Sequence, residues 1–510
     1  MNPFLHSMVY ICVAKMSVAP FTHLMIFVSL LIDTPHPPSN GVVLLYLRVL
    51  MFFLIRVPSF LLPPSSLLHN PHSTLLASLV EIAIRSGMEE ARLRRLQCSV
   101  KKYDWGLPGG VSQVGRLHAL NWGCELQAEE PYAELWMGTH DSGPSFLASS
   151  NGNGVSLSLS LKDWISDNPD VLGHKVLHKW GSNLPFLFKV LSVGKALSIQ
   201  AHPDNDLATT LHKLHPHLYK DSNHKPEMPL AITPFHALCG FITLKELKGV
   251  LHTVPEIVEL VGSTNTNLVL QINDQDDEEK VKPVLRAVFT NLMSASKERV
   301  TDAVNRLKSR LLKESEVRQL TDKEQLVLRL EKQYPADIGV IAAFFLNHVK
   351  LNPGEALFLG ANEPHAYLSG ECVECMATSD NVVRAGLTPK HRDVQTLCSM
   401  LTYKQGAPEI LRGVPINPYV NKYTPPFEEF EIDRCILPQK ETVVFPAVPG
   451  PSIFLVTVGE GTMNTGSPKG HKVTEGDVIF AAANTEISVT SASKLHLYRA
   501  GVNSKFFQAS

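Results

Sequence analysis

The first 87 residues of this sequence contain almost no acidic side chains, with Asp33 and Glu81 as the only two. Prolines, serines and bulky apolar residues are common there, yet no uninterrupted run suits a membrane span. The span VVLLYLRVLMFFLI is shorter than a transmembrane core and contains Arg48, and the span MSVAPFTHLMIFVSLLI contains Pro20 and His23. Low acidic content is also typical of transit peptides, but arginines are few and the hydrophobic character is too continuous.

We therefore expect Met88 to be the functional start, with residues 1–87 a disordered extension or an artefact of gene prediction. The alternative is a membrane anchor or an organelle-targeting segment. For the folded part of the chain we expect no membrane association.

Cysteine is also scarce, because the 510 residues contain only eight, scattered from Cys12 to Cys435. This spacing excludes a disulfide framework and suits a reducing compartment, so the predicted location is the cytoplasm. Excess charge is absent too, since 47 basic and 49 acidic residues give a net charge of -2. Nothing in this balance favours nucleic acid or an anionic membrane as a partner, and any anion site must be local.

The pattern of apolar residues changes twice after Met88. Short apolar runs such as LPFLFKVLSV and ALCGFI, broken by Gly, Pro and Asn, predict a β-rich region up to about Phe241. Segments such as KERVTDAVNRLKSRLL then show three- and four-residue apolar spacing, which predicts amphipathic helices. Strand patterns return after about Asp337. The predicted domains are 88–241 (catalytic domain, first part), 242–336 (helical insert), 337–408 (catalytic domain, second part) and 409–510 (carboxy-terminal domain).

An internal repeat lies in the second β region. GEALFLGANEPHAYL from Gly354 and GDVIFAAANTEISVT from Gly476 align without a gap, and His365 of the first copy matches Ile487 of the second. We infer two related barrels, of which only the first has the side chains to bind a metal.

Gln200 and His202 lie two residues apart in GKALSIQAH. In a strand their side chains point the same way, while Ala201 points into the other layer. An isolated pair of this kind is typical of a hydrogen-bonded strand end, so further ligands are needed to indicate a metal site. The segments GKALSIQAH and GEALFLGANEPH resemble the two signature segments of cupins, jelly-roll barrels whose facing strands offer metal ligands to the interior.

NHKPEMPLAI adds a carboxylate, Glu227. Gln200, His202, Glu227 and His365 together offer one amide oxygen, two imidazoles and one carboxylate, a set suited to Zn²⁺ with room for water or substrate. With only one charged ligand, the site would keep a net positive charge that favours a developing anion.

Longer motifs make a family resemblance close. VKKYDWG, PYAELWMGTH, LPFLFKVLSVGKALSIQAHPD, HKPEM and NEPHAYLSGECVECMATSDNVVRAGLTPK together resemble the type I phosphomannose isomerases, over essentially residues 88–510. The resemblance implies a mainly β fold with a helical insert: two cupin-type jelly-roll barrels plus an α-helical domain. It also implies a monomeric enzyme with one Zn²⁺ per chain, interconverting the hexose phosphates mannose 6-phosphate and fructose 6-phosphate and supplying GDP-mannose synthesis.

The resemblance assigns the metal ligands to Gln200, His202, Glu227 and His365, and the essential arginine to Arg384. Aldose–ketose isomerisation through an enediol also needs a proton-transfer base and a phosphate anchor. For the base, Glu374 and Lys225 stay open, with Glu374 preferred because a carboxylate is ionised at neutral pH. The donors expected to contact the phosphate are Ser198, Lys189 and Lys390. Trp105 and Tyr367 are expected to line the sugar pocket, with Asp380 as a further substrate-binding residue.

Other features receive simpler interpretations. Cys372 and Cys375 of CVEC fall on opposite faces of a strand, so we interpret both as packing residues rather than a zinc pair. Nearby histidines are expected to be solvated or hydrogen-bonded rather than a second metal site: His212, His215, His217, His224 and His391. Asn205 replaces a lysine found in many relatives, which would alter affinity more than chemistry. The alternative functions are a non-catalytic sugar-binding or metal-storage cupin and an iron-dependent dioxygenase.

Overall fold

The computed structural model describes residues 92–148, 159–273, 276–466 and 470–508. The chain divides into two units, 1–81 and 82–510, and every described residue belongs to the second. The expectations for residues 1–87 therefore lie outside the described residues. Within the described ranges, no helix has the length and apolar character needed to cross a membrane.

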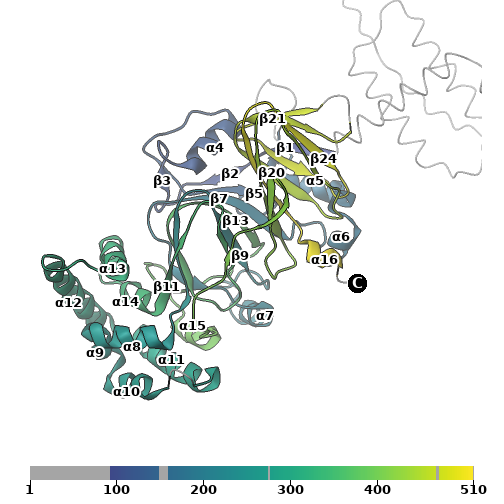
Figure 1. The fold of residues 1–510 in the computed structure, drawn as a ribbon. Coiled ribbons are helices and arrows are strands. Elements are labelled where there is room, and N and C mark those ends of the chain that lie inside the picture. The colour runs from purple at the N-terminus through teal and green to yellow at the C-terminus, as the bar shows by residue number, and fades with distance from the viewer. Residues whose placement is uncertain (1–91, 149–158, 274–275, 467–469, 509–510) are drawn as a thin grey trace, which may run out of the picture. The chain divides into compact units, whose positions relative to one another are not determined.

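A sheet of eleven strands forms the centre of the second unit (Figure 1). Its strands are β2 (Ser99–Lys101), β5 (Glu134–Met137), β7 (Phe186–Val193), β8 (Ile199–Ala201), β9 (Glu227–Ala231), β10 (Phe235–Phe241), β11 (Leu346–Leu351), β12 (Ala356–Leu357), β13 (His365–Ala377), β14 (Val383–Gly386) and β15 (Ile410–Leu411). The long strand β13 pairs antiparallel with β7, β8, β9 and β10, so it connects the two sequence segments on either side of the helical insert.

The carboxy-terminal strands form an eight-stranded and a four-stranded sheet around an apolar core. The eight-stranded sheet contains β1 (Leu93–Gln97), β6 (Phe146–Leu147), β16 (Val414–Asn417), β17 (Val420–Tyr423), β18 (Glu431–Leu437), β20 (Ser452–Val458), β23 (Val478–Ala481) and β25 (Leu495–Gly501). The four-stranded sheet contains β19 (Thr442–Phe445), β21 (Glu460–Asn464), β22 (His471–Thr474) and β24 (Ile487–Ser491). Strand β1 therefore lies in the eight-stranded sheet, paired with β23, although the sequence analysis placed residues 88–241 in the catalytic domain.

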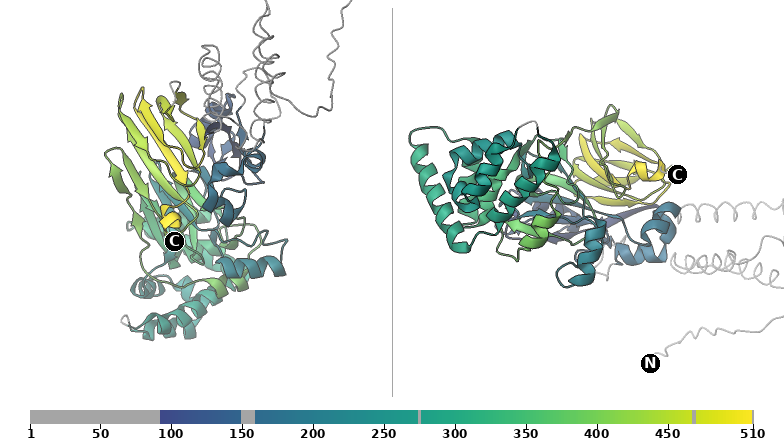
Figure 2. Two further views of the ribbon diagram at one scale, coloured as in Figure 1. Left: turned by 90° about the vertical axis from the view of Figure 1, so that its right-hand side faces the viewer. Right: turned by 90° about the horizontal axis from the view of Figure 1, so that it is seen from below.

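Helices occupy the region where the sequence predicts them. They are α8 (Leu244–Thr253), α9 (Pro255–Val261), α10 (Ser263–Gln271), α11 (Glu278–Met293), α12 (Lys297–Ser315) and α13 (Asp322–Gln333), followed by α14 (Ile338–Ala342) and the 3₁₀ turn η2 (Ala343–Phe345). Figure 2 shows them on the opposite side of the eleven-stranded sheet from the carboxy-terminal strands. Shorter elements complete the fold: β3 (Leu107–Pro108), β4 (Pro131–Tyr132), α4 (Gln113–Trp122), α5 (Leu161–Asp167), η1 (Pro169–Leu172), α6 (His174–Trp180), α7 (Asn205–Leu214), α15 (Val394–Met400) and α16 (Ser504–Gln508).

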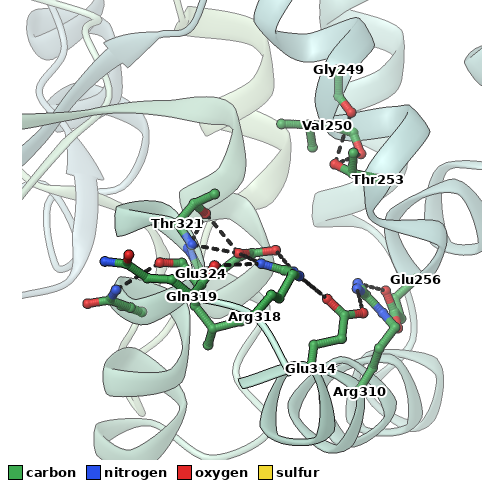
Figure 3. Close-up of polar contacts among 12 residues, drawn as sticks. Gly249, Val250, Thr253, Glu256, Arg310, Glu314, Arg318, Gln319, Thr321 and Glu324 are labelled. Carbon is green, nitrogen blue, oxygen red and sulfur yellow. Dashed lines mark hydrogen bonds and ion pairs between the residues drawn. The ribbon is translucent and has the colours of Figure 1, made fainter. Parts of the chain in front are cut away.

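Local polar contacts explain where these helices begin. Thr321 and Glu324 form a reciprocal capping box at the start of α13, which satisfies backbone N–H groups that the helix leaves unpaired (Figure 3). Arg318 pairs with both Glu314 and Glu324 in the same view. The apolar faces of these helices share one core with the outward-facing residues of β8 and β14.

The internal repeat is visible in the backbone. Gly354 and Gly476 both have positive φ, 91° and 86°, and Asn362 and Asn484 both adopt left-handed φ, 63° and 58°. Such conformations favour glycine and asparagine, which explains why these residues match in the two copies. Ile487 lies buried in the apolar core of the carboxy-terminal sheets.

The side-chain alternation of β13 shifts within the stretch from Tyr367 to Cys372. The pairing with β10 has a register irregularity between Tyr367 and Ser369 and ends at Ser369, and Gly370, with φ of 104°, begins the pairing with β7. As a result Tyr367 before the shift and Cys372 after it share one core, although an odd spacing would place them on opposite faces of a regular strand. A Cβ atom at Gly370 would lie 2.3 Å from the carbonyl oxygen of Pro234.

The variant Gly370→Ala is expected to lower the free energy of unfolding by roughly 3 kcal/mol, because unfavourable φ and a backbone clash add together. Gly406→Ala is the matched control, since Gly406 has φ of 108° but nothing within 4 Å of an added Cβ, and only about 1 kcal/mol should be lost there. Denaturant unfolding of both variants measures the difference. Equal losses would show that the close approach to Pro234 is unimportant.

Candidate metal centre

Three ligand-type side chains converge on one buried point of the eleven-stranded sheet. His202 follows β8, Glu227 begins β9 and His365 begins β13, and their ligand atoms all lie within 4.8 Å of one another. Each of the three residues is at most 2% exposed. Among the described residues, no other group of three His, Cys, Asp or Glu side chains meets this condition.

Hydrogen bonds orient both imidazoles toward the shared point. His202 Nδ1 lies 2.7 Å from the carbonyl oxygen of Asn381, and His365 Nδ1 lies 2.9 Å from that of Glu363. Because a carbonyl can only accept, each Nδ1 carries the proton and each Nε2 presents a lone pair. Both Nε2 atoms are buried without a hydrogen-bond partner, and each lies 3.4 Å from a different oxygen of Glu227. Two unsatisfied lone pairs beside a carboxylate fit a divalent cation.

The protonation states also suit a metal. Burial lowers the pKa of His202 to about 4. Burial alone would raise the pKa of Glu227, but the Lys225 ammonium and the two imidazoles hold it well below its usual value. A neutral imidazole and an ionised carboxylate are the forms that coordinate a cation, so neither His202 nor Glu227 needs to lose a proton when one binds.

Gln200 lies beside His365, and Arg384 lies beside Gln200 on the next strand. Gln200 is the Cα partner of His365 across β8 and β13, and of Arg384 across β8 and β14. Residues directly opposite in antiparallel strands share a face. The sequence predicts that the Ala201 side chain points into another layer than that of Gln200. This is confirmed, because Ile199 and Ala201, on either side of Gln200, both belong to the apolar core shared with the helices. Ser198 Oγ donates to Gln200 Oε1 at 3.2 Å.

Two cationic side chains approach the centre differently. Lys225 Nζ lies 3.1 Å from Glu227 Oε1. The Arg384 guanidinium is half-buried, and no hydrogen bond or ion pair joins it to another described residue. Burial lowers the pKa of Arg384, although an arginine side chain remains charged at neutral pH. Its charge is therefore available to an anionic group of a bound molecule.

A buried network of charges extends from the centre. Lys189 Nζ lies 3.1 Å from Glu374 and 3.3 Å from Glu134, and Tyr367 donates to Glu374 at 2.7 Å. Glu134 also accepts from the Trp136 indole N–H at 2.6 Å. Burial raises the pKa of Glu374, whereas the Lys189 ammonium opposes that rise.

This network corrects one sequence prediction and adds one residue that the sequence did not indicate. Lys189 is 6% exposed and its charge is compensated by two carboxylates, which favours a positioning role over direct phosphate contact. Glu134 was not singled out in the sequence. Its only signal was an acidic residue within the apolar run YAELWM.

The remaining predicted substrate residues are less closely tied to the centre. Trp105 is half-buried against the core that contains Tyr367. Asp380 pairs with His140 at 3.4 Å, and the bond from His140 lowers the pKa of Asp380 against the opposing effect of burial. Lys390 is exposed, and its backbone N–H donates to Thr388. No hydrogen bond or ion pair joins the Lys390 side chain to His202, Glu227 or His365.

The cysteines and histidines that received simpler interpretations have the following surroundings. Cys372 and Cys375 are buried free thiols in two different apolar cores. His212 bonds to the carbonyl oxygen of Tyr219 and His224 bonds to Glu429. His215, His217 and His391 are exposed.

Comparison with known families gives three matches along the chain. The family models are Phosphomannose isomerase type I, catalytic domain, over residues 93–244; the helical insertion domain of the same family, over 260–346; and its C-terminal domain, over 423–468.

Curated relatives match most of the chain. Mannose-6-phosphate isomerase 2 of Arabidopsis thaliana is 60% identical over 426 residues, which cover 83% of this chain and 96% of the relative. Mannose-6-phosphate isomerase 1 of the same plant is 62% identical over 419 residues, covering 82% and 96%. The human mannose-6-phosphate isomerase is 41% identical over 426 residues, covering 81% and 99%.

Solved structures agree with these relatives. A crystal structure of an alanine variant of phosphomannose isomerase from Salmonella typhimurium has 27% identity and a TM-score of 0.67, covering 81% of this chain and 100% of that one. A zinc-bound holo crystal structure of mannose 6-phosphate isomerase gives the same identity, coverage and TM-score.

Proposed function

The chain belongs to the type I phosphomannose isomerases and is a mannose-6-phosphate isomerase, and on this premise we propose that it works as a zinc enzyme through an enediol intermediate. The substrates are mannose 6-phosphate and fructose 6-phosphate. One Zn²⁺ per chain would be held by His202, Glu227 and His365, with Gln200 as the fourth ligand.

One observation carries this proposal. Two buried imidazole nitrogens without hydrogen-bond partners face the two oxygens of one carboxylate. Leaving such groups unsatisfied is costly, so the arrangement is best explained by a bound cation. When bound, Zn²⁺ supplies a Lewis acid that stabilises negative charge on sugar oxygens.

The side chains around the centre have separate roles in the proposed reaction. Arg384 stabilises the negative charge that develops when a proton leaves the carbon beside the carbonyl. Glu374 transfers that proton between neighbouring carbons, and Lys189 and Tyr367 hold its carboxylate in place. Each carboxylate oxygen has two lone pairs, so Glu374 can still accept a proton while it accepts these bonds. Lys225 is the alternative base.

Substrate binding completes the proposed site. Ser198 and Lys390 would contact the phosphate, while Trp105, Tyr367 and Asp380 would line the sugar pocket, and Lys189 acts through Glu374 rather than on phosphate. We further propose that both β regions are cupin-type jelly rolls, that the enzyme is a cytoplasmic monomer, and that its mannose 6-phosphate supplies GDP-mannose synthesis.

The two candidate bases give different pH dependences. Because Lys189 opposes the rise in the pKa of Glu374, its removal should raise that pKa further. Activity requires the ionised carboxylate and is lost as pH falls through this pKa. Lys189→Met should therefore move the acidic limb of the kcat profile upward by roughly one pH unit or more.

Lys189→Arg is the control for this measurement, because it keeps the positive charge beside Glu374 and should leave the limb nearly unchanged. An acidic limb that stays in place in Lys189→Met would reject Glu374 as the base and favour Lys225.

Isotope exchange tests the proposed function directly. The enzyme is incubated with mannose 6-phosphate in heavy water, with and without a metal chelator. Deuterium at carbon 2 of the aldose or carbon 1 of the ketose, lost on chelation, is the expected result. Ketose formed without any solvent deuterium would contradict solvent-exchanging enediol chemistry, and neither ketose nor label would leave only binding.

A further inference from the structure

A second cluster of ionisable side chains lies away from the metal centre, at the junction of α13 with β10 and β11. It surrounds a cavity of about 250 Å³. The lining residues are His236, Asp322, Gln325, Leu326, Arg329, His348 and Lys350.

The strand register separates this cavity from the metal centre. His236 pairs with Lys350 and Leu238 pairs with His348, so the three polar residues share one face of β10 and β11. Ala237 and Cys239, on the opposite face, belong to the core that contains Tyr367. The cavity and the catalytic region therefore lie on opposite sides of the same two strands.

The cavity carries unbalanced positive charge. Lys350 and Asp322 form an ion pair and largely cancel each other. Arg329 has a buried Nε without a hydrogen-bond partner, and no described carboxylate pairs with it. By contrast, Arg310 and Arg318 on the same helical insert are each held by two glutamates (Figure 3). The Arg329 guanidinium thus has donors that no described protein group uses.

Two histidines complete the site. His236 Nδ1 lies 3.2 Å from His348 Nε2, so one ring donates to the other and the remaining nitrogens stay available. Burial and the nearby cations lower the pKa of both rings, that of His348 to about 4. The charged groups around the pair are Arg329, Lys350, Lys323 and Asp322. An anion placed among these cations would favour protonation of the pair.

We propose that this cavity binds a small oxyanion, phosphate-like and free or as a monoester, through the Arg329 fork and the His236–His348 pair, with uptake of a proton by that pair. The planar guanidinium matches the geometry of two oxyanion oxygens. The site is independent of the isomerase reaction proposed above.

Sulfate is a suitable probe, because it remains a dianion across the tested pH range and its own titration cannot imitate that of histidine. Calorimetric titration of the full chain should detect a sulfate site that Arg329→Gln weakens at least tenfold. Arg318→Gln removes an arginine already paired with glutamates and should leave binding unchanged. Arg384→Gln should also leave this site intact, which separates it from anion binding at the catalytic centre.

The pH dependence supplies a second test. Sulfate should bind about three- to tenfold more tightly near pH 6 than near pH 8, because the histidine pair gains a proton on binding. His348→Gln should remove this difference. Comparison of inorganic phosphate with sn-glycerol 3-phosphate then shows whether the free ion or the ester is preferred. Unchanged binding in Arg329→Gln, or pH-independent binding in the unmodified chain, would overturn the proposal.

Discussion

Glu227→Gln is expected to lower kcat/KM for mannose 6-phosphate by roughly 10³-fold and to reduce the metal content of the purified enzyme. Among the described residues, Glu227 supplies the carboxylate between the two imidazoles. One of its oxygens lies 3.4 Å from His202 Nε2 and the other lies 3.4 Å from His365 Nε2. Glutamine preserves shape but provides no negative charge and only one acceptor oxygen. Steady-state kinetics and elemental analysis of the same preparation measure both effects.

Glu256→Gln is the matched control, because Glu256 is also a buried glutamate with a cationic partner, Arg310 at 2.9 Å. It lies in the helical insert, so the variant should lose stability while keeping metal content and kcat/KM. If Glu227→Gln retained full metal content and activity, the proposed centre would be wrong.

Arg384→Lys is expected to lower kcat by roughly 10²-fold without loss of metal. Arg384 lies across from Gln200 on β14, and its guanidinium has no protein partner in the described ranges. A lysine keeps the charge but cannot offer two parallel donors to a developing oxyanion. The signature is a fall in kcat with unchanged metal content, measured on one preparation.

Arg412→Lys serves as the control, since Arg412 is 83% exposed and pairs only with Glu355. Its kinetics should match those of the unmodified enzyme. An Arg384→Lys variant that raised KM alone, with kcat unchanged, would instead assign Arg384 to ground-state substrate binding.

The sequence predicted those parts of the site that local patterns determine. Alternation along a strand predicted that the side chains of Gln200 and Ala201 point to opposite faces. The internal repeat identified the turn that precedes His365. Glu134 could not be found in this way, because its approach to Lys189 depends on the pairing of β5 with β7. For the same reason the sequence could not show that only glycine fits at position 370, because the backbone of Pro234 that leaves no room for a Cβ atom is far away in the chain.

The order of strand-rich and helical segments followed from hydrophobic periodicity, whereas the sheet to which β1 belongs did not. Residues 93–97 are adjacent in sequence to the catalytic strands, and nothing local distinguishes them from β2. Their pairing with β23 is a property of tertiary structure. The histidine pair at the β10–β11 junction was equally hidden, because His236 and His348 are separated by the whole helical insert.

The pairing of β1 with β23 has a consequence for synthesis of the protein. Leu93 is translated early, yet its partner Ala481 emerges only after the helical insert and most of the carboxy-terminal strands. Until then β1 has unpaired backbone groups along the edge that β23 will occupy, a state that invites aggregation or chaperone binding. Closure of this sheet is therefore a late step of maturation, and ribosome stalling before residue 478 would leave β1 paired with β6 but without its second neighbour, β23.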